Sequence, residues 1–214
     1  SSDVCSSDLD LFTYIINNWS HLLILTMDHI LMVISGLLMA LVVGIPLGVL
    51  CAKNERISKI ILAVVSMIQV FPSIALLGIL MVFFGLGFKT VVIGLFLYSL
   101  LPIVRNTYVG LKEVDDNISQ AGIGVGMTMM QLLLKVQLPL SLPFLLAGIR
   151  VAAVIAVGIA TLAPFIGGDG LGRDIVAGIN TRNSVKIYSG AIIAAILAIL
   201  ADLTLGKAQK RLEH

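Results

Sequence analysis

Long apolar runs follow one another along most of the chain, separated by short segments that carry the polar and charged residues. A run of about 20 apolar residues has the length that an α-helix needs to cross the hydrocarbon core of a bilayer. The pattern therefore predicts an all-α integral membrane protein with about five transmembrane helices. The expected spans cover residues 30–52, 57–86, 89–111, 142–166 and 187–205.

The second run, residues 57–86, is too long for one straight span and too short for two. As a helix its 30 residues would extend about 45 Å, against a hydrocarbon core of about 30 Å. Pro72 follows Phe71 inside this run, and proline kinks or breaks a helix because it has no backbone N–H. We therefore expect one crossing with a kink or a re-entrant half, whose freed carbonyl groups face protein or a water-filled path.

The first run contains Gly44, Pro46 and Gly48. Glycine lets a neighbouring helix approach closely, and a proline inside a helix bends its axis. We therefore expect close helix packing along this part of the first span.

Short segments flank the transmembrane domain, which is expected to cover residues 30–206. Residues 1–9 begin without Met and are interpreted as a non-native or disordered tail. Residues 10–29 mix apolar and polar side chains, which predicts an amphipathic segment at the membrane interface. Residues 207–214 are expected to form a basic tail.

The histidines and cysteines do not have the spacing of a ligand set. His21 and His29 lie in the interfacial segment and are interpreted as solvated side chains. Cys5 and Cys51 form neither a disulfide framework nor a metal motif. We therefore expect no metal site.

One long stretch, residues 115–143, interrupts the apolar pattern. Asp115 can cap a short helix, and three glycines spaced two residues apart then weaken that helix and permit a turn. Thr128 can cap a second short helix, which Pro139 and Pro143 are expected to end. The stretch therefore predicts a bent pair of short helices at the membrane surface.

The same stretch has a specific spacing. It reads Gln120-Ala121-Gly122, three residues, Gly126, nine residues, Val136, one residue and Leu138-Pro139. This spacing resembles the cytoplasmic loop of binding-protein-dependent ATP-binding cassette (ABC) importers, which reads Glu-Ala-Ala, three residues, Gly, nine residues, Ile, one residue and Leu-Pro. The resemblance implies that residues 115–140, with Thr128 at the second helix, are a coupling loop that lies in a groove of a partner ATPase.

Two positions depart from that pattern. Gln120 replaces the usual Glu, so an ionic contact becomes a neutral hydrogen bond that is about half as strong. Gly122 replaces the second Ala, which loosens the helix by up to about 1 kcal/mol. We therefore expect the shape of the loop to be kept better than its charge.

Further strings resemble permease subunits of osmoprotectant importers for glycine betaine, carnitine and choline. They lie at residues 44–48, 68–80, 96–111, 142–150 and 167–172. The resemblance covers nearly the whole chain from residue 21. It implies the transmembrane domain of a type I ABC importer, with a fold similar to that of the methionine-importer permease.

The resemblance also implies partners. These are ABC ATPase subunits, a second permease subunit that is identical or a paralogue, and an extracytoplasmic solute-binding protein at a bacterial plasma membrane. The sequence has no GxxxxGK[ST] motif, so we expect a transport subunit that is not an enzyme and binds no cofactor, with ATP and Mg held by the partner ATPase.

Other functions are weighed against this interpretation. The net charge of +2 does not suggest a nucleic-acid partner, while 58% hydrophobic residues and a mean hydropathy of +1.07 exclude an ordinary soluble domain. The alternatives are an ABC permease for another small solute such as an amino acid, and a secondary transporter or channel. An intramembrane hydrolase is disfavoured because no serine motif accompanies the histidines.

Lys and Arg are divided unevenly between the two sides that five crossings define. The larger group is Lys53, Arg56, Lys59, Arg105, Lys112, Lys135, Arg150, Lys207, Lys210 and Arg211, and the smaller group is Lys89, Arg173, Arg182 and Lys186. Cytoplasmic loops carry an excess of basic residues. We therefore expect the N-terminus outside and both the coupling loop and the C-terminus in the cytoplasm.

The broken second run is the candidate translocation path. Its residues are Gln69, Phe71, Pro72 and Ser73, with Tyr98 as a further candidate. A quaternary ammonium ion cannot donate hydrogen bonds, and an aromatic face attracts it by about 0.5–2 kcal/mol. The alternative, that Phe71 and Tyr98 only pack between helices, is equally open.

Three charged residues fall inside the expected spans: Arg105, Arg150 and Asp202. Charges inside a membrane face the protein interior or water. We favour a structural ion pair between Arg150 and Asp202 over a role in gating.

Overall fold

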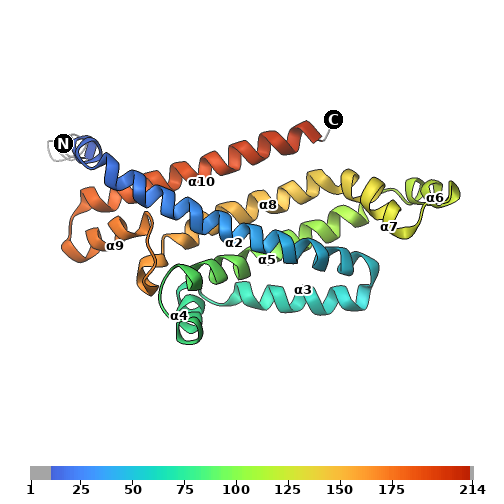
Figure 1. The fold of residues 1–214 in the computed structure, drawn as a ribbon, viewed down its shortest axis with the longest axis horizontal. Helices are drawn as coiled ribbons and strands as arrows, with labels where there is room; N and C mark the ends of the chain where they lie inside the picture. The colour runs from blue at the N-terminus through green and yellow to red at the C-terminus, as the bar shows by residue number, and fades with distance from the viewer. Residues whose placement is uncertain (1–10, 213–214) are drawn as a thin grey trace.

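The computed structural model describes residues 11–212, which are almost entirely helical and contain no β-strand (Figure 1). Residues 11–17 are helical and precede a turn at Asn18. The elements that follow are α2 Trp19–Lys53, α3 Glu55–Val70, α4 Ser73–Phe84, α5 Phe88–Lys112, α6 Asp116–Gly124, α7 Met129–Leu132, the π-helix η1 Leu133–Gln137, α8 Leu138–Ala160, the 3₁₀-helix η2 Ala163–Ile166, α9 Gly172–Thr181 and α10 Ser184–Leu212. The expected all-α fold class is confirmed.

Within residues 11–212, four helical segments are long and apolar enough to cross a membrane: α2, α5, the continuous stretch Met129–Ala160, and α10. Helices α3 and α4 together form a fifth, bent by 100° at their junction. Figure 1 shows α2, α3, α5, α8 and α10 along the long axis, whereas α4 turns away from it. The expectation of about five spans with a break at Phe71–Pro72 is therefore confirmed.

Several span boundaries differ from those expected. The first helix begins at Trp19 and not near residue 30, so part of the segment 10–29 belongs to the same helix as the span. The helix of the fourth span ends at Ala160, where 3₁₀ turns replace the α-helix before Pro164. The last helix continues through the expected tail to Leu212, and Lys210 and Arg211 lie in its final turn, where cations stabilise a helix. The tail 1–9 lies outside the described residues.

The most extensive contact between two helices of the described residues joins α2 to α5. Gly36, Ala40, Gly44 and Gly48, each four residues after the last, are buried on α2. A Cβ atom at Gly44 would lie 2.8 Å from Ile103 Cγ2 on α5, so only glycine fits there. The close approach expected at Gly44 and Gly48 is confirmed, and it follows the small-residue rule for membrane helices.

The core lies around α5 and the C-terminal half of α8. Its buried members include Met32 from α2, Leu77 from α4, Leu95 from α5 and Ala156 from α8. Helices α6 and α7 lie at one end of the bundle, toward which the last turns of α10 point, and residues 11–17 and α9 lie at the other end (Figure 1). We call these the α6–α7 end and the α9 end.

Candidate coupling and translocation sites

The first helix of the candidate coupling segment is fixed at both of its ends. Asp115 Oδ1 accepts a hydrogen bond of 2.8 Å from the backbone N–H of Asn117, as the capping prediction requires. After Gly124 the chain turns through Gly126, whose φ of +85° favours glycine. The predicted cap and turn are therefore present.

The second helix begins with a reciprocal cap. The N–H of Gln131 donates to Thr128 Oγ1 at 3.3 Å, and the N–H of Thr128 donates to Gln131 Oε1 at 2.9 Å. Such a capping box satisfies two donors at a helix start. It confirms the capping role predicted for Thr128.

The prediction that Pro139 and Pro143 end this second helix is wrong. The helix continues from α7 through η1 into α8, as far as Ala160. Proline cannot donate a hydrogen bond to the carbonyl four residues earlier and its ring crowds that carbonyl. The turn before Pro139 widens instead, so that the N–H of Leu138 donates to the carbonyl of Leu133 and the chain stays helical.

Gly122 has a packing role that the sequence did not reveal. It is buried, and a Cβ atom there would lie 2.6 Å from Leu132 Cδ1. Gln137 adds a polar link, since its Nε2 donates to Ser119 Oγ at 3.3 Å. The resembled pattern has Ala at this position, and the Gly found here lets α6 lie against the second helix.

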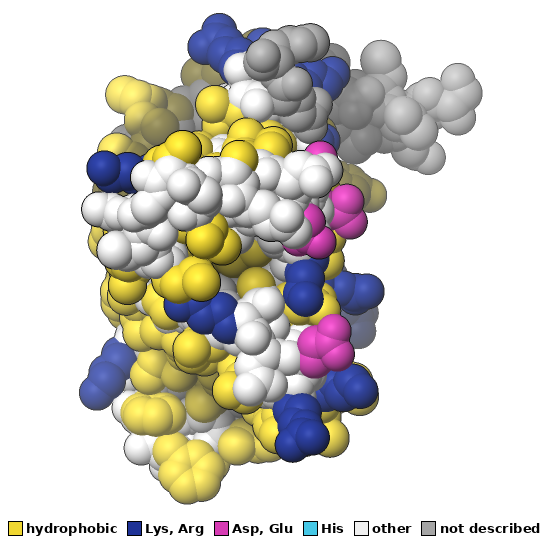
Figure 2. All heavy atoms as spheres, turned by 90° about the vertical axis from the view of Figure 1, so that its right-hand side faces the viewer, with side chains coloured by type: hydrophobic (Ala, Val, Ile, Leu, Met, Phe, Trp, Pro, Cys, Tyr) yellow, Lys and Arg dark blue, Asp and Glu magenta, His cyan; other side chains and the backbone are white. Residues whose placement is uncertain are grey.

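The remaining predicted coupling residues form an accessible surface at the α6–α7 end. Gln120, Ala121, Gly126, Thr128 and Pro139 are exposed, whereas Val136 and Leu138 are half-buried. Large apolar side chains are exposed beside them: Ile118, Ile123, Val125, Met129, Met130 and Leu134. Figure 2 looks onto this end, where Lys and Arg side chains surround the surface and a few acidic side chains lie along one edge. The surface is mostly uncharged and suits contact with another protein.

The break between α3 and α4 is tied to α5 by two hydrogen bonds. Tyr98 Oη donates to the carbonyl of Phe71 at 2.6 Å, and Gln69 Nε2 donates to the backbone carbonyl of Tyr98 at 2.9 Å. The carbonyl of Tyr98 has no helical partner because the residue four positions later is Pro102. Each bond therefore satisfies a carbonyl group left free by a proline or by the end of a helix.

The predicted path residues differ in accessibility. Tyr98 is 5% exposed and its hydroxyl is bonded within the chain, which favours packing over solute contact for this ring. Phe71 is 50% exposed and Pro72 is exposed, while Gln69 and Ser73 are half-buried. The freed carbonyl of Phe71 thus faces protein, and the Phe71 ring remains accessible.

Two of the three charged residues inside the spans meet. Arg150 Nη2 donates to Asp202 Oδ2 at 2.6 Å, and Arg150 Nε donates to Asp202 Oδ1, so the ion pair is bidentate. Gly206 leaves room for the guanidinium, because a Cβ atom there would lie 3.3 Å from Arg150 Cζ. The predicted pair is present. Arg105 lies elsewhere, exposed on α5 beside a cavity of about 410 Å³ that α3 also lines through Leu62 and Ser66.

The solvated position expected for His29 is wrong, because this side chain is fully buried. Its Nε2 lies 3.2 Å from the carbonyl of Val157, which is free because the N–H of Thr161 bonds to Gly158 instead. A carbonyl only accepts, so Nε2 carries the proton, and Nδ1 has no hydrogen-bond partner among residues 11–212. His29 is buried because it packs against α8, a contact that cannot be predicted from the polarity of a histidine side chain.

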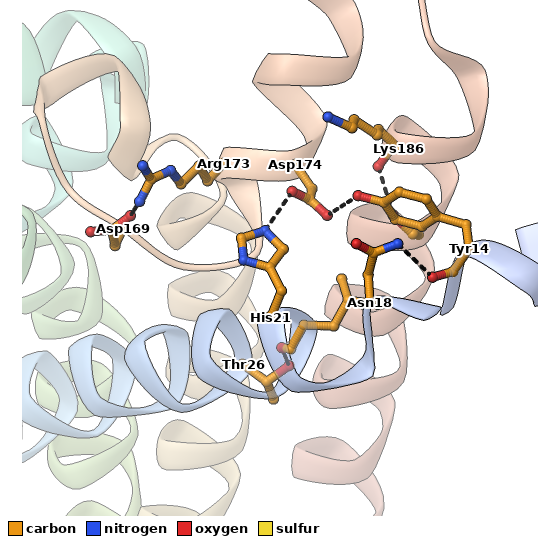
Figure 3. A network of polar contacts seen from close by, with 10 residues as sticks. Tyr14, Asn18, His21, Thr26, Asp169, Arg173, Asp174 and Lys186 are labelled. Atoms are coloured by element: carbon orange, nitrogen blue, oxygen red, sulfur yellow. Dashed lines mark hydrogen bonds and ion pairs between the residues drawn. The ribbon is translucent and has the colours of Figure 1, made fainter. Parts of the chain in front are cut away.

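A polar cluster at the α9 end also escaped sequence analysis (Figure 3). Tyr14 Oη donates to Asp174 Oδ2 at 3.2 Å, and His21 Nε2 lies 3.2 Å from Asp174 Oδ1. Burial raises the pKa of Tyr14, and the Asp174 carboxylate raises it further, so the phenol stays protonated and donates at neutral pH. Residues 11–212 contain no group of three His, Cys, Asp or Glu side chains suited to a metal ion.

Comparison with known proteins places this geometry in a family. Residues 44–214 match the model of the binding-protein-dependent transport system inner membrane component. The chain belongs to this family. The predicted membership is confirmed, and the match includes α3 to α10, with the candidate coupling segment and the helix break.

Individual members of the family are similar over nearly their whole length. The chain is 44% identical over 201 residues to the glycine betaine/carnitine/choline transport system permease protein OpuCD of Bacillus subtilis (strain 168), covering 94% of this chain and 88% of that protein. It is 42% identical over 203 residues to the carnitine transport permease protein OpuCD of Listeria monocytogenes serotype 1/2a (strain 10403S), covering 94% and 91%.

The fold is shared with a solved transporter structure. A chain of the inward-facing MetNI methionine ABC transporter superimposes with a TM-score of 0.80 at 22% identity, covering 89% of this chain and 95% of that chain. This similarity concerns the fold alone. It confirms the prediction of a type I ABC importer transmembrane domain resembling the methionine-importer permease.

Proposed function

We propose that this chain is the permease subunit of an ATP-driven importer of quaternary ammonium osmoprotectants such as glycine betaine, carnitine and choline. The observation that carries the proposal is 44% identity over 94% of the chain to a permease whose name gives all three solutes. A relative named for carnitine transport is almost as similar, at 42% identity. The chain forms the translocation path, and separate subunits supply ATP hydrolysis and solute capture.

The α6–α7 end is the surface that receives the partner ATPase. Its predicted contact residues Gln120 and Ala121 are exposed on α6, and uncharged apolar side chains surround them. Closure of the ATPase dimer moves α6 and α7, and α8 carries the motion into the bundle because it continues the second coupling helix. ATP and Mg bind to the ATPase subunits.

The α6–α7 end faces the cytoplasm of a bacterial cell, and the α9 end faces outward. Basic residues support this orientation, since Lys53, Arg56 and Lys59 lie where α2 meets α3, and Lys210 and Arg211 end α10 at the same end of the bundle (Figure 1). The solute-binding protein then docks at the α9 end. A second permease subunit, identical or paralogous, completes the pore.

The break at Phe71–Pro72 lines the path of the solute. The half-exposed ring of Phe71 offers an aromatic face to the solute. A quaternary ammonium ion has no hydrogen-bond donors but is attracted to such a face by a cation–π interaction. Gln69 and Tyr98 hold this break against α5 and so position the ring.

Uptake measurements test the proposal. A bacterial strain without its own osmoprotectant importers would express this chain together with its ATPase, second permease and binding protein. We expect labelled glycine betaine, carnitine or choline to accumulate at high osmolarity, and an inactive ATPase to abolish the accumulation. Uptake of an amino acid alone would assign another solute, and uptake that continues without ATP hydrolysis and stops with an ionophore would indicate a secondary transporter.

A further inference from the structure

Arg105 is a charged side chain in a membrane-spanning helix. It is exposed on α5, seven residues before that helix ends at Lys112, which places it about 10 Å inside the span. Its side chain makes no ion pair or hydrogen bond with another of residues 11–212, whereas Arg150 is paired with Asp202. A charge at such a depth is costly unless it meets a partner or water. Arg105 therefore requires water or an anion from outside this chain.

The Arg105 side chain borders a cavity of about 410 Å³ between α3 and α5. Helix α5 contributes Leu101, Arg105 and Tyr108, whose spacing of four and three residues places them on one face. Helix α3 contributes Leu62 and Ser66. Pockets that hold small molecules have volumes of about 300–1,000 Å³ and combine an apolar lining with a few polar groups. The cavity has this size and this composition.

The cavity lies on the same helix contact as the break at Phe71–Pro72. Ser66 precedes Phe71 by five residues on α3, which corresponds to about 7 Å of helix. Arg105 follows Tyr98 by seven residues on α5, which corresponds to about 10 Å. The cavity is therefore displaced from the break toward the α6–α7 end (Figure 1). In the proposed orientation, a solute that has passed the break meets this cavity next on its way to the cytoplasm.

The polar groups around the cavity suit a solute that carries two opposite charges. The guanidinium of Arg105 can bind a carboxylate through two parallel N–H···O bonds, and the half-buried ring of Tyr108 offers a face to a quaternary ammonium group. The hydroxyls of Ser66 and Tyr108 form no hydrogen bond with another of the described residues, so both remain open to a ligand. The described lining residues include no acidic side chain that would compete for the guanidinium.

We propose that the cavity between α3 and α5 is a binding site for zwitterionic solutes, in which Arg105 holds the carboxylate and Tyr108 holds the quaternary ammonium group. This inference rests on the proposed importer function and deepens it. Glycine betaine and carnitine carry both groups, whereas choline carries an alcohol in place of the carboxylate. Arg105 therefore favours glycine betaine and carnitine over choline at this site, and Tyr108 serves all three solutes.

Uptake by the reconstituted importer tests the role of Arg105. The complete transporter in proteoliposomes, with saturating binding protein, would be supplied with labelled glycine betaine or labelled choline. We expect Arg105→Gln to lower glycine betaine uptake about tenfold, because a hydrogen bond to a charged group is lost, and to leave choline uptake unchanged to within about twofold. Choline uptake also reports that the variant is folded and driven by ATP. Lys112→Gln removes a cation from the same helix outside the cavity and should change neither rate.

Other surroundings of Arg105 predict different results. An ion pair with the second permease subunit would make Arg105→Gln lower the uptake of both solutes equally, and a side chain that only reaches the membrane surface would make it lower neither. Either result would overturn the site. If Arg105→Gln does not assemble, Arg105→Lys carries the test, because it keeps the charge and loses the planar fork. Glycine betaine uptake should then fall about threefold with choline uptake unchanged, and parallel changes would overturn the site.

Variants of Tyr108 test the other half of the site. Tyr108→Leu removes the aromatic face and should lower the uptake of both solutes by about two- to fivefold. Tyr108→Phe keeps that face and should retain both rates. Equal uptake in Tyr108→Leu and Tyr108→Phe would overturn the role of the ring.

The same measurements separate this inference from the proposed function. If the unmodified transporter imports glycine betaine and choline and Arg105→Gln leaves the ratio of their rates unchanged, the function stands and the inference fails. If the unmodified transporter imports no quaternary ammonium solute, the proposed function fails and the inference fails with it.

Discussion

The side-chain amide of Gln69 donates a hydrogen bond of 2.9 Å to the backbone carbonyl of Tyr98, a carbonyl that Pro102 leaves without a helical partner. An unpaired carbonyl inside a bilayer costs free energy, because no water reaches it. Gln69 therefore compensates for a proline on another helix, and the two positions depend on each other.

This dependence predicts a double-mutant cycle. Gln69→Leu leaves the Tyr98 carbonyl unpaired and should destabilise the protein by about 1–3 kcal/mol. Pro102→Ala supplies an N–H for the same carbonyl, so Gln69→Leu should cost much less in that background. The measurement is thermal unfolding in detergent, with Met67→Leu on the exposed face of α3 as a control that should change little. Equal costs of Gln69→Leu in the two backgrounds would contradict this account.

The packing of Gly122 predicts a change in coupling. Gly122→Val places side-chain atoms where Leu132 lies and should push α6 away from the second helix, which lowers solute-stimulated ATP hydrolysis in the reconstituted transporter. The thermal stability of the spans should stay the same. Gly124→Ala is the matched control, because a Cβ atom there meets nothing within 4 Å. Unchanged solute-stimulated ATP hydrolysis in Gly122→Val would show that coupling does not depend on the contact of α6 with the second helix.

The contact of α2 with α5 predicts a loss of stability. Gly44→Val overlaps with Ile103 and should lower the free energy of unfolding by about 1–3 kcal/mol or more, since membrane helices associate through close packing. Gly78→Ala on α4 meets nothing within 4 Å and serves as the comparison. Unfolding in nanodiscs, followed by circular dichroism, would measure both. Similar unfolding temperatures for the two variants would count against the packing role.

The bidentate pair predicts non-additive substitutions. Arg150→Ala or Asp202→Ala alone leaves one charge without its partner, so each should reduce the amount of folded protein in the membrane. The double variant removes both charges and should recover much of that loss, as measured by detergent-resistant size-exclusion profiles. Independent, additive effects would show that the contact does not stabilise the fold.

Local patterns predicted the features that depend on neighbours in sequence. The approximate number of spans, the break at Pro72 and the cap at Thr128 each follow from a few adjacent residues and were found as expected. The ion pair of Arg150 with Asp202 was predicted because a charged side chain inside a membrane usually pairs with another charge or faces the protein interior or water.

Other contacts between distant residues were not predicted. Asp174 meets Tyr14 from 160 positions away, and nothing in either neighbourhood marks the contact. His29 is buried against α8, where its Nε2 meets a carbonyl 128 positions later in the chain. Pro139 was expected to end a helix, because the sequence does not show that the preceding turn widens and keeps the chain helical despite the missing N–H of the proline.

That widened turn keeps α7 and α8 in one uninterrupted helical segment. The stretch Met129–Ala160 has 32 residues, which at about 1.5 Å per residue corresponds to about 48 Å of helix measured along its axis. A helix with such a backbone resists compression along its axis far more than a hinged pair would. In the proposed coupling, a displacement of Met129 would pass along this one continuous segment, with no loop between the ATPase contact and α8 to absorb it.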